Sequence, residues 1–283
     1  MRPSGARRDQ GGASQTVASK KPVAAARSLW KQLRPPSGPA WLWRSGSLVG
    51  LAVVWEIAAL FANSNMLPTP IAVLAAIYRY TRSGQLPLEL AITLGRVAAA
   101  FVVAMTLGAA IGFMMGRFRR FNLLLDGALV LALNIPALVV IILCYLWLGL
   151  TEAAIIVAVA LNKIPVVVVT TREGTRAVDA RLLAVAQVYR VPRMVTLYRV
   201  YLPQLYPYLM ASARNGLALI WKIVLVAELL GRSNGVGFEL SLFFQFFDIT
   251  SILAYTLAFA AVVMAIEAGV MRPLEKRLTR WRG

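Results

Sequence analysis

The sequence has 283 residues, of which 59% are hydrophobic, whereas an ordinary soluble domain is about 45–50% apolar. The formal net charge is +18, and the chain holds one cysteine, Cys144, and no histidine. A single cysteine excludes a disulfide framework, and the absence of histidine removes the commonest metal ligand and general base. We therefore expect an integral membrane protein with no catalytic residue, no metal site and no cofactor of its own, rather than a soluble domain.

Residues 1–45 are rich in Arg, Lys, Ser, Gly, Pro and Ala and show no sustained apolar periodicity. This composition predicts a flexible basic tail. Between Arg27 and Arg44, tryptophans and basic residues are mixed, which suits contact with anionic membrane lipid.

Six apolar runs follow the tail, and each is expected to form a transmembrane helix. They are residues Ser47–Ala62, Ala91–Met115, Leu123–Leu148, Ala153–Thr171, Leu205–Leu230 and Ile252–Met271. The first is marginal, because about 20 residues are needed to cross the hydrocarbon core. The runs predict an all-α integral membrane domain over residues 46–272, since a barrel would show short alternating strands.

Lysine and arginine residues collect on one side of this arrangement. Nine lie in the tail, three in the loop 117–120, six in the segment 171–204 and five from Arg272 onward. The opposite loops hold only Arg79, Arg82 and Arg232. By the positive-inside rule, both termini, including the basic segment 273–283, are expected to be cytoplasmic. The topology explains the net charge, so nucleic acid is not an expected partner.

Several charged residues fall inside the expected spans, where they should face protein or water because charge is costly in hydrocarbon. They are Glu56, Arg96, Lys163, Arg214, Lys222, Glu228 and Glu267. Some of them, such as Arg96, could equally snorkel towards a span end. Glu228 and Arg232 are four residues apart, and we expect them to pair at the outer end of the fifth span.

Small residues and helix breakers mark three spans. Gly108, Gly112 and Gly116 form a repeated small-xxx-small pattern, which predicts close helix packing. Asn134 and Pro136 interrupt the third span, and residues 162–165 interrupt the fourth. Broken helices occur along transport pathways, but proline kinks are also common without that role, and the pattern alone leaves both interpretations open.

The cytoplasmic stretch Asp179–Pro203 is partly apolar yet basic. Its apolar positions recur at helical spacing at Leu182, Leu183, Ala186 and Tyr189. Pro192 is expected to end a first short helix, and Pro203 to precede the fifth span. A short helix pair of this kind suits docking on a soluble partner, and the alternative is a helix that only lies on lipid.

This stretch resembles the cytoplasmic motif of the permease subunits of ATP-binding-cassette (ABC) importers, in particular the nitrate/sulfonate/taurine type. The family motif reads Glu-Ala-Ala-x-x-x-Gly, then a variable run, then Leu-Pro. The matching positions are Asp179, Leu182, Ala186, Val200, Leu202 and Pro203. Further resemblances, weak singly but specific in their order and spacing, are Leu67–Pro70, Thr93–Val97, Gly174–Asp179, Trp221, Val226–Glu228 and Gly235–Gly237.

Two positions depart from the family motif. The family's glutamate falls on Ala184 and its glycine on Arg190. Because glycine normally permits a tight turn there, arginine suggests a differently shaped turn, or a new positive charge against the docking partner.

The resemblance implies a type I ABC importer permease in a bacterial inner membrane, which forms the pathway for a small solute such as nitrate, a sulfonate or taurine. The implied residues for coupling to the ATPase are Asp179, Leu182, Leu183, Ala184, Ala186, Arg190, Pro192 and Pro203. A possible translocation path or outer gate comprises Asn134, Pro136, Trp221, Lys222, Glu228, Gly235 and Gly237.

The implied partners are cytoplasmic ABC ATPases, a second permease copy or a paralogous permease, and an extracytoplasmic solute-binding protein. The sequence has no G-x-x-x-x-G-K-[ST] motif, so ATP and Mg²⁺ would be bound by the partner ATPase. The main alternative is a stand-alone secondary transporter or channel without an ATPase. A membrane enzyme is a further alternative, but paired carboxylates and histidine are lacking.

Overall fold

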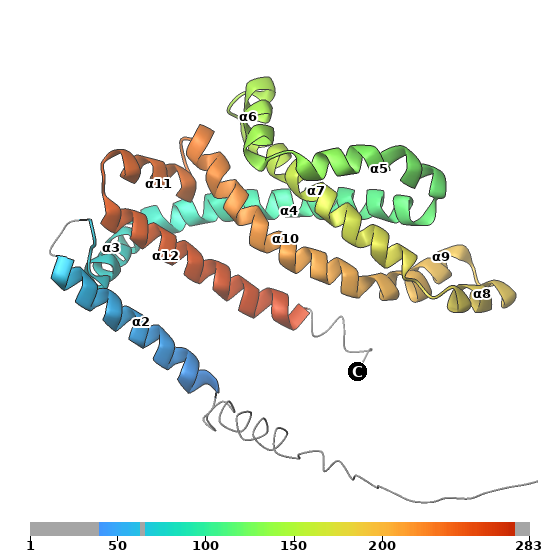
Figure 1. Ribbon diagram of the computed structural model, residues 1–283, viewed down its shortest axis with the longest axis horizontal. Coiled ribbons are helices and arrows are strands. Elements are labelled where there is room, and N and C mark those ends of the chain that lie inside the picture. The colour runs from blue at the N-terminus through green and yellow to red at the C-terminus, as the bar shows by residue number, and fades with distance from the viewer. Residues whose placement is uncertain (1–39, 63–65, 275–283) are drawn as a thin grey trace, which may run out of the picture. The chain divides into compact units, whose positions relative to one another are not determined.

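The computed structural model describes residues 40–62 and 66–274, and helices make up almost all of them (Figure 1). Most of the expected tail and of the basic segment 273–283 lies outside these residues. The chain divides into two units, and the division falls between Val54 and Trp55. In the first unit the described part is the beginning of helix α2 (Ala40–Ala62), which starts inside the range expected for the tail.

The second unit holds the rest of α2 and the remaining described helices. They are α3 (Pro70–Arg82), α4 (Gln85–Arg117), α5 (Arg119–Asn134), α6 (Ala137–Leu148), α7 (Glu152–Arg176), α8 (Ala180–Val188), α9 (Arg193–Thr196), the π-helical turn η1 (Leu197–Tyr201), α10 (Leu202–Gly231), α11 (Val236–Gln245), α12 (Ile249–Ile266) and the π-helical turn η2 (Glu267–Met271).

Four helical segments of the described chain are long and apolar enough to cross a membrane. They are α4, α7, the continuous stretch from α9 to α10, and α12 with its extension, and they match the expected second, fourth, fifth and sixth spans. The bent pair of α5 and α6 matches the third. The first expected span lies in α2, where the apolar helix Val49–Phe61 is shorter than the others.

The third span is broken where the sequence predicted an interruption. Helices α5 and α6 meet at an angle of 99°, which is visible in Figure 1 as the turn between the two green helices. Ile135, directly before Pro136, is extended with φ −73° and ψ 125°. Proline disfavours the helical conformation of the residue before it and lacks the N–H needed for the helix ladder, so the break follows from the local sequence.

The fourth span is not broken, and the expected interruption at residues 162–165 is wrong. Helix α7 continues through Pro165, which is buried. The side-chain amide of Asn162 donates to the carbonyl of Ala158 inside the same helix at 2.9 Å. Membrane helices tolerate proline where neighbouring helices and polar side chains support the backbone, and α7 packs against α4, α6 and α10.

The close approach of α4 to α7 confirms the packing predicted from the glycine pattern. A Cβ atom added at Gly112 would lie 2.6 Å from the carbonyl oxygen of Val168, and one at Gly108 would lie 2.6 Å from Cβ of Val167. Any side chain at these positions would push the two helices apart, so the glycines set the distance between them.

The main core lies where α7 meets α6 and α10, and α12 contributes Tyr255 and Phe259 to it. Ile155 and Val159 of α7 and Val224 of α10 are fully buried, as is Tyr255 of α12. Large apolar side chains on α5 and α6, such as Leu124 and Trp147, are instead exposed. An exposed apolar surface of this kind is expected of a helix bundle embedded in lipid.

Candidate functional site

A cluster of charged side chains joins α4, α7 and α10 near the end of α10. Nη1 of Arg96 in α4 lies 2.7 Å from Oε1 of Glu228 in α10. Nε and Nη2 of the same arginine donate to both carboxylate oxygens of Glu152, at 2.8 and 2.6 Å. Arg96 and Glu228 are buried, whereas Glu152, the first residue of α7, is half exposed. We call Arg96, Glu152, Glu228, Thr93 and Asn234 the Arg96 cluster.

The loop between α10 and α11 closes over this cluster. Backbone N–H of Gly237 and the hydroxyl of Thr93 both donate to Oε2 of Glu228, at 2.9 and 3.0 Å. The carbonyl of Asn234 accepts from Nη1 of Arg96 at 3.0 Å. Gly235 has φ 99°, a left-handed conformation that favours glycine. Both oxygens of the buried Glu228 carboxylate are therefore hydrogen-bonded, by Thr93 and Arg96 of α4 and by the backbone of Gly237 in α11.

This geometry brings together motifs that lie far apart in the sequence. The predicted gate residues Glu228, Gly235 and Gly237 lie together, and the motif around Thr93 and Arg96 meets them. Arg96 does not snorkel, because its guanidinium is buried between two carboxylates.

The expected pair of Glu228 with Arg232 is wrong. Arg232 donates instead to the carboxylate of Glu152 and to the carbonyl of Leu150. The sequence interpretation also missed Glu152, Asn234 and Glu89, whose carboxylate accepts from the backbone N–H of Gly235. Their partners lie in distant parts of the chain, and no local spacing points to such contacts.

The other residues expected on the pathway are placed elsewhere. Trp221 is buried in the core, where its ring meets that of Phe259 edge-on at 6.3 Å. Lys222 is exposed on α10. Asn134 and Pro136 are exposed at the break between α5 and α6, where the Asn134 amide donates to the carbonyl of Val130 at 2.7 Å.

The second candidate region is the short helix α8, at the opposite end of α10. Asp179 caps its N-terminus, because a side-chain oxygen of Asp179 accepts from the backbone N–H of Arg181 at 2.8 Å. Leu182, Val185 and Tyr189 are exposed, whereas Ala186 is buried and Leu183 is half-buried. The apolar stripe predicted from the sequence is therefore divided between an outer face and an inner face of α8, and Ala184 is exposed with the outer face.

Helix α8 ends in a turn of the type that glycine usually completes. Arg190 has φ 49°, its N–H donates to the carbonyl of Gln187, and the N–H of Val191 donates to the carbonyl of Ala186. These two bonds and the left-handed residue define a Schellman motif. The turn at Arg190 thus has the geometry that glycine favours, rather than the different shape expected from the substitution.

The segment after this turn differs from the expected separate helix pair. Pro192 caps α9, and the helix then continues through η1 into α10 without interruption. Pro203 lies in the first turn of α10 and does not separate it from the preceding turns. The second short helix is therefore the beginning of the fifth span, and α8 alone stands apart from it.

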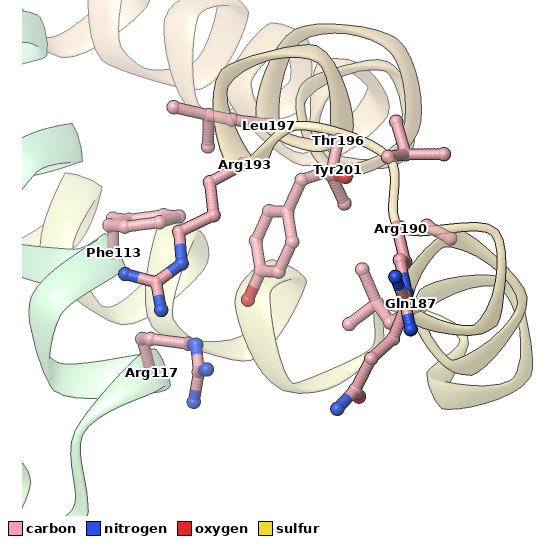
Figure 2. Close-up of a pocket in the computed structure, with 11 residues that line it drawn as sticks. Phe113, Arg117, Gln187, Arg190, Arg193, Thr196, Leu197 and Tyr201 are labelled. Carbon is pink, nitrogen blue, oxygen red and sulfur yellow. The ribbon is translucent and has the colours of Figure 1, made fainter.

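A cavity of about 530 Å³ lies between α8, the end of α4 and the α9–η1 turns. Figure 2 shows Tyr201 reaching into it, with Arg117 and Arg193 on one side of the ring and Arg190 with Gln187 on the other. The inner face of α8 contributes Leu183 and Ala186 to its lining.

Comparison with known proteins gives consistent results. Residues 104–272 match the family described as the binding-protein-dependent transport system inner membrane component. The chain is 31% identical to the putative aliphatic sulfonates transport permease protein SsuC of Bacillus subtilis, over 88% of this chain and 91% of that protein. It is 28% identical to the taurine transport system permease protein TauC of Escherichia coli, over 82% and 86% of the two chains.

A solved chain of the MetNI methionine ABC transporter, in an inward-facing conformation, has a similar fold. It superposes with a TM-score of 0.59 over 69% of this chain and 96% of that chain, at 13% sequence identity. A chain of an amino acid ABC transporter superposes with a TM-score of 0.58, over 71% and 97% of the two chains. The all-helical fold, the matched family model and the similarity to SsuC together show that this chain belongs to the binding-protein-dependent transport system inner membrane component family, the permease subunits of ABC importers.

Proposed function

We propose that this permease works with cytoplasmic ATPases that dock on the exposed face of α8, and that it carries a small solute with a negatively charged oxygen group. The observation that supports docking most directly is the row of exposed apolar side chains on α8. Leu182, Val185 and Tyr189 lie on a short helix that stands apart from the spans and ends in a well-defined turn. Exposed apolar clusters on a defined element typically mark protein interaction sites.

The proposed orientation of the chain in the membrane is based on the distribution of its positive charges. The α8 end of the molecule holds many arginines, among them Arg117, Arg181 and Arg199, and by the positive-inside rule this supports a cytoplasmic location for this end and for both termini. The ATPases would then bind ATP and Mg²⁺ at that side. A solute-binding protein and a second permease copy or paralogue would complete the importer.

The proposed solute class comes from the relatives. SsuC is named for aliphatic sulfonates, TauC for taurine, and a Synechocystis protein 27% identical to this chain is named nitrate import permease NrtB. All three names refer to solutes with a compact, negatively charged oxygen group. We propose that the gate that admits such a solute is at the Arg96 cluster, because this cluster joins α4 to the beginning of α7 and the end of α10.

Co-purification of the ATPase with the full-length permease tests the docking proposal. The double variant Leu182→Ser with Tyr189→Ser should lose most of the bound ATPase and most ATP-driven uptake. The matched control is Phe244→Ser with Phe246→Ser, which removes two exposed apolar side chains at the C-terminal end of α11. Equal ATPase recovery from both variants, or uptake that persists after deletion of the ATPase, would favour a stand-alone secondary transporter instead.

A further inference from the structure

The cavity behind α8 has an unusual charge balance. Its polar lining consists mainly of the guanidinium groups of Arg117, Arg190 and Arg193, together with Gln187. Among the described residues, no Asp or Glu lines it. Its volume of about 530 Å³ lies inside the range of roughly 300–1,000 Å³ that small-molecule sites occupy.

Neighbouring arginines show how this end of the molecule usually neutralises its charge. Arg172 lies 2.6 Å from the carboxylate of Asp126, and Arg176 lies 3.5 Å from the carboxylate of Glu173. Within the part of the chain that the structure describes, the three cavity arginines form no such ion pair, and Arg117 only lies over the ring of Phe118. Positive charges around one cavity repel each other, and an anion placed between them removes that repulsion.

The rest of the lining is apolar. Leu183, Val191 and Leu197 contribute aliphatic walls, and the rings of Phe113 and Tyr201 meet edge-on at 5.3 Å. The hydroxyl of Tyr201 donates to the carbonyl of Thr175, so this polar group already has a partner. A ligand for this cavity therefore needs a negatively charged group and an apolar part.

The position of the cavity matches that requirement. Arg117 is the last residue of α4, and Phe113 lies one turn back toward the apolar span. The cavity thus lies where a span meets the cytoplasmic membrane surface, as the charge distribution places it. Basic pockets between spans at this surface are suited to lipid headgroups.

We propose that this cavity binds the phosphate of an anionic phosphodiester and that a phospholipid headgroup supplies it. Arg117 and Arg193, on the same side of Tyr201 in Figure 2, hold the phosphate oxygens. Arg190 and Gln187 face the rest of the headgroup, and an acyl chain runs past Phe113. The bound lipid supports the inner face of α8 while the outer face stays free for docking. The proposal does not depend on which solute is carried.

Native mass spectrometry of the full-length permease in detergent tests this site. Phosphatidylglycerol and phosphatidylcholine are titrated separately into the unmodified protein and two double variants. Arg117→Gln with Arg193→Gln removes two cavity charges, and Arg119→Gln with Arg120→Gln removes two exposed charges from the first turn of α5, outside the cavity. We expect the affinity for phosphatidylglycerol to fall about tenfold in the cavity variant and less than about twofold in the control. Phosphatidylcholine should bind more weakly throughout.

Two further arms distinguish the source of the anion and the role of charge. Arg117→Lys with Arg193→Lys keeps both charges and should lose less phosphatidylglycerol binding than the Gln variant. Millimolar inorganic phosphate should leave the lipid bound. If phosphate displaces the lipid and binds with the same dependence on the arginines, the lipid source is wrong. Equal phosphatidylglycerol binding by all variants, with ATPase co-purification lost only from the cavity variant, would overturn the proposal in favour of a partner carboxylate.

Discussion

The guanidinium of Arg96 and the carboxylate of Glu228, 132 positions apart in the sequence, lie 2.7 Å from each other. Both side chains are buried, and the pair connects α4 to α10 at the end where the loop 232–235 folds back. A second carboxylate, that of Glu152, attaches α7 to the same arginine. The geometry therefore makes one arginine of α4 the common partner of α7 and α10.

Replacing Glu228 tests the strength of this connection. Glu228→Leu should destabilise the permease by about 3–5 kcal/mol. The substitution removes one of the two carboxylates that pair with the buried Arg96, and it also removes the acceptor for Thr93 and Gly237. Glu228→Gln keeps an acceptor oxygen and should cost less. Thermal unfolding in detergent measures both, with the exposed Lys222→Gln on the same helix as the control. Equal melting temperatures for Glu228→Leu and the control would show that the pair contributes nothing.

In the turn after α8, a substitution is expected to stabilise the protein. A non-glycine residue in the left-handed region costs about 1 kcal/mol, and the Schellman bonds hold Arg190 there. Arg190→Gly should therefore stabilise the protein by up to about 1 kcal/mol, whereas Arg190→Val should destabilise it. The control is Arg181→Gly inside α8, which should cost about 1 kcal/mol because glycine is a poor helix former. A drop in melting temperature for Arg190→Gly would contradict the left-handed geometry.

The interface of α4 and α7 can be tested with two alanine substitutions in one helix. At Gly112, a new Cβ would lie 2.6 Å from the carbonyl oxygen of Val168 and 2.8 Å from Cβ of Thr171, and backbone cannot move aside cheaply. Gly112→Ala should destabilise the protein by about 1–3 kcal/mol. Gly95→Ala, where no atom lies within 4 Å, should stabilise it by up to about 1 kcal/mol. Similar melting temperatures for the two variants would mean that α4 and α7 are farther apart.

Lys163 is a buried charged residue with no evident stabilising role. Its side chain is 2% exposed, it packs against Gly216 of α10, and Nζ has no hydrogen-bond partner among the described residues. Removing an unpaired polar group from an apolar interior recovers its desolvation cost, so Lys163→Met should stabilise the permease by about 1–3 kcal/mol. Melting temperature is the measurement, and Lys163→Ala, which leaves a cavity, is the comparison. Destabilisation by Met would indicate a partner in the complete assembly.

Local patterns allowed much of the fold to be predicted. Apolar runs located the spans, and Pro136 located the break between α5 and α6, because proline acts on the residue before it. The same reasoning was wrong at Pro165, where packing on α4 and α10 keeps α7 helical. A local rule gives a correct prediction only where no tertiary contact overrides it.

The site was less predictable because its contacts are non-local. The sequence motifs identified Glu228, Gly235 and Gly237, yet the spacing rule assigned Glu228 the wrong partner. An i,i+4 rule describes one helix and cannot show that Arg96 arrives from another. For a similar reason, the sequence predicted one apolar stripe on α8 where the structure has an exposed and a buried face. Ala186 is buried by neighbours that the sequence alone does not identify.

The central claim is that the exposed face of α8 docks on an ATPase, and site-directed photo-cross-linking tests it most directly. In a Cys144→Ser background, Leu182→Cys and Phe246→Cys each supply one exposed thiol for a maleimide-benzophenone probe. Illumination of the native membrane should join the probe at position 182, but not the probe at 246, to a protein that mass spectrometry identifies as a P-loop ATPase. Cross-links from position 182 to lipid alone, or equal ATPase cross-linking from both positions, would contradict the account.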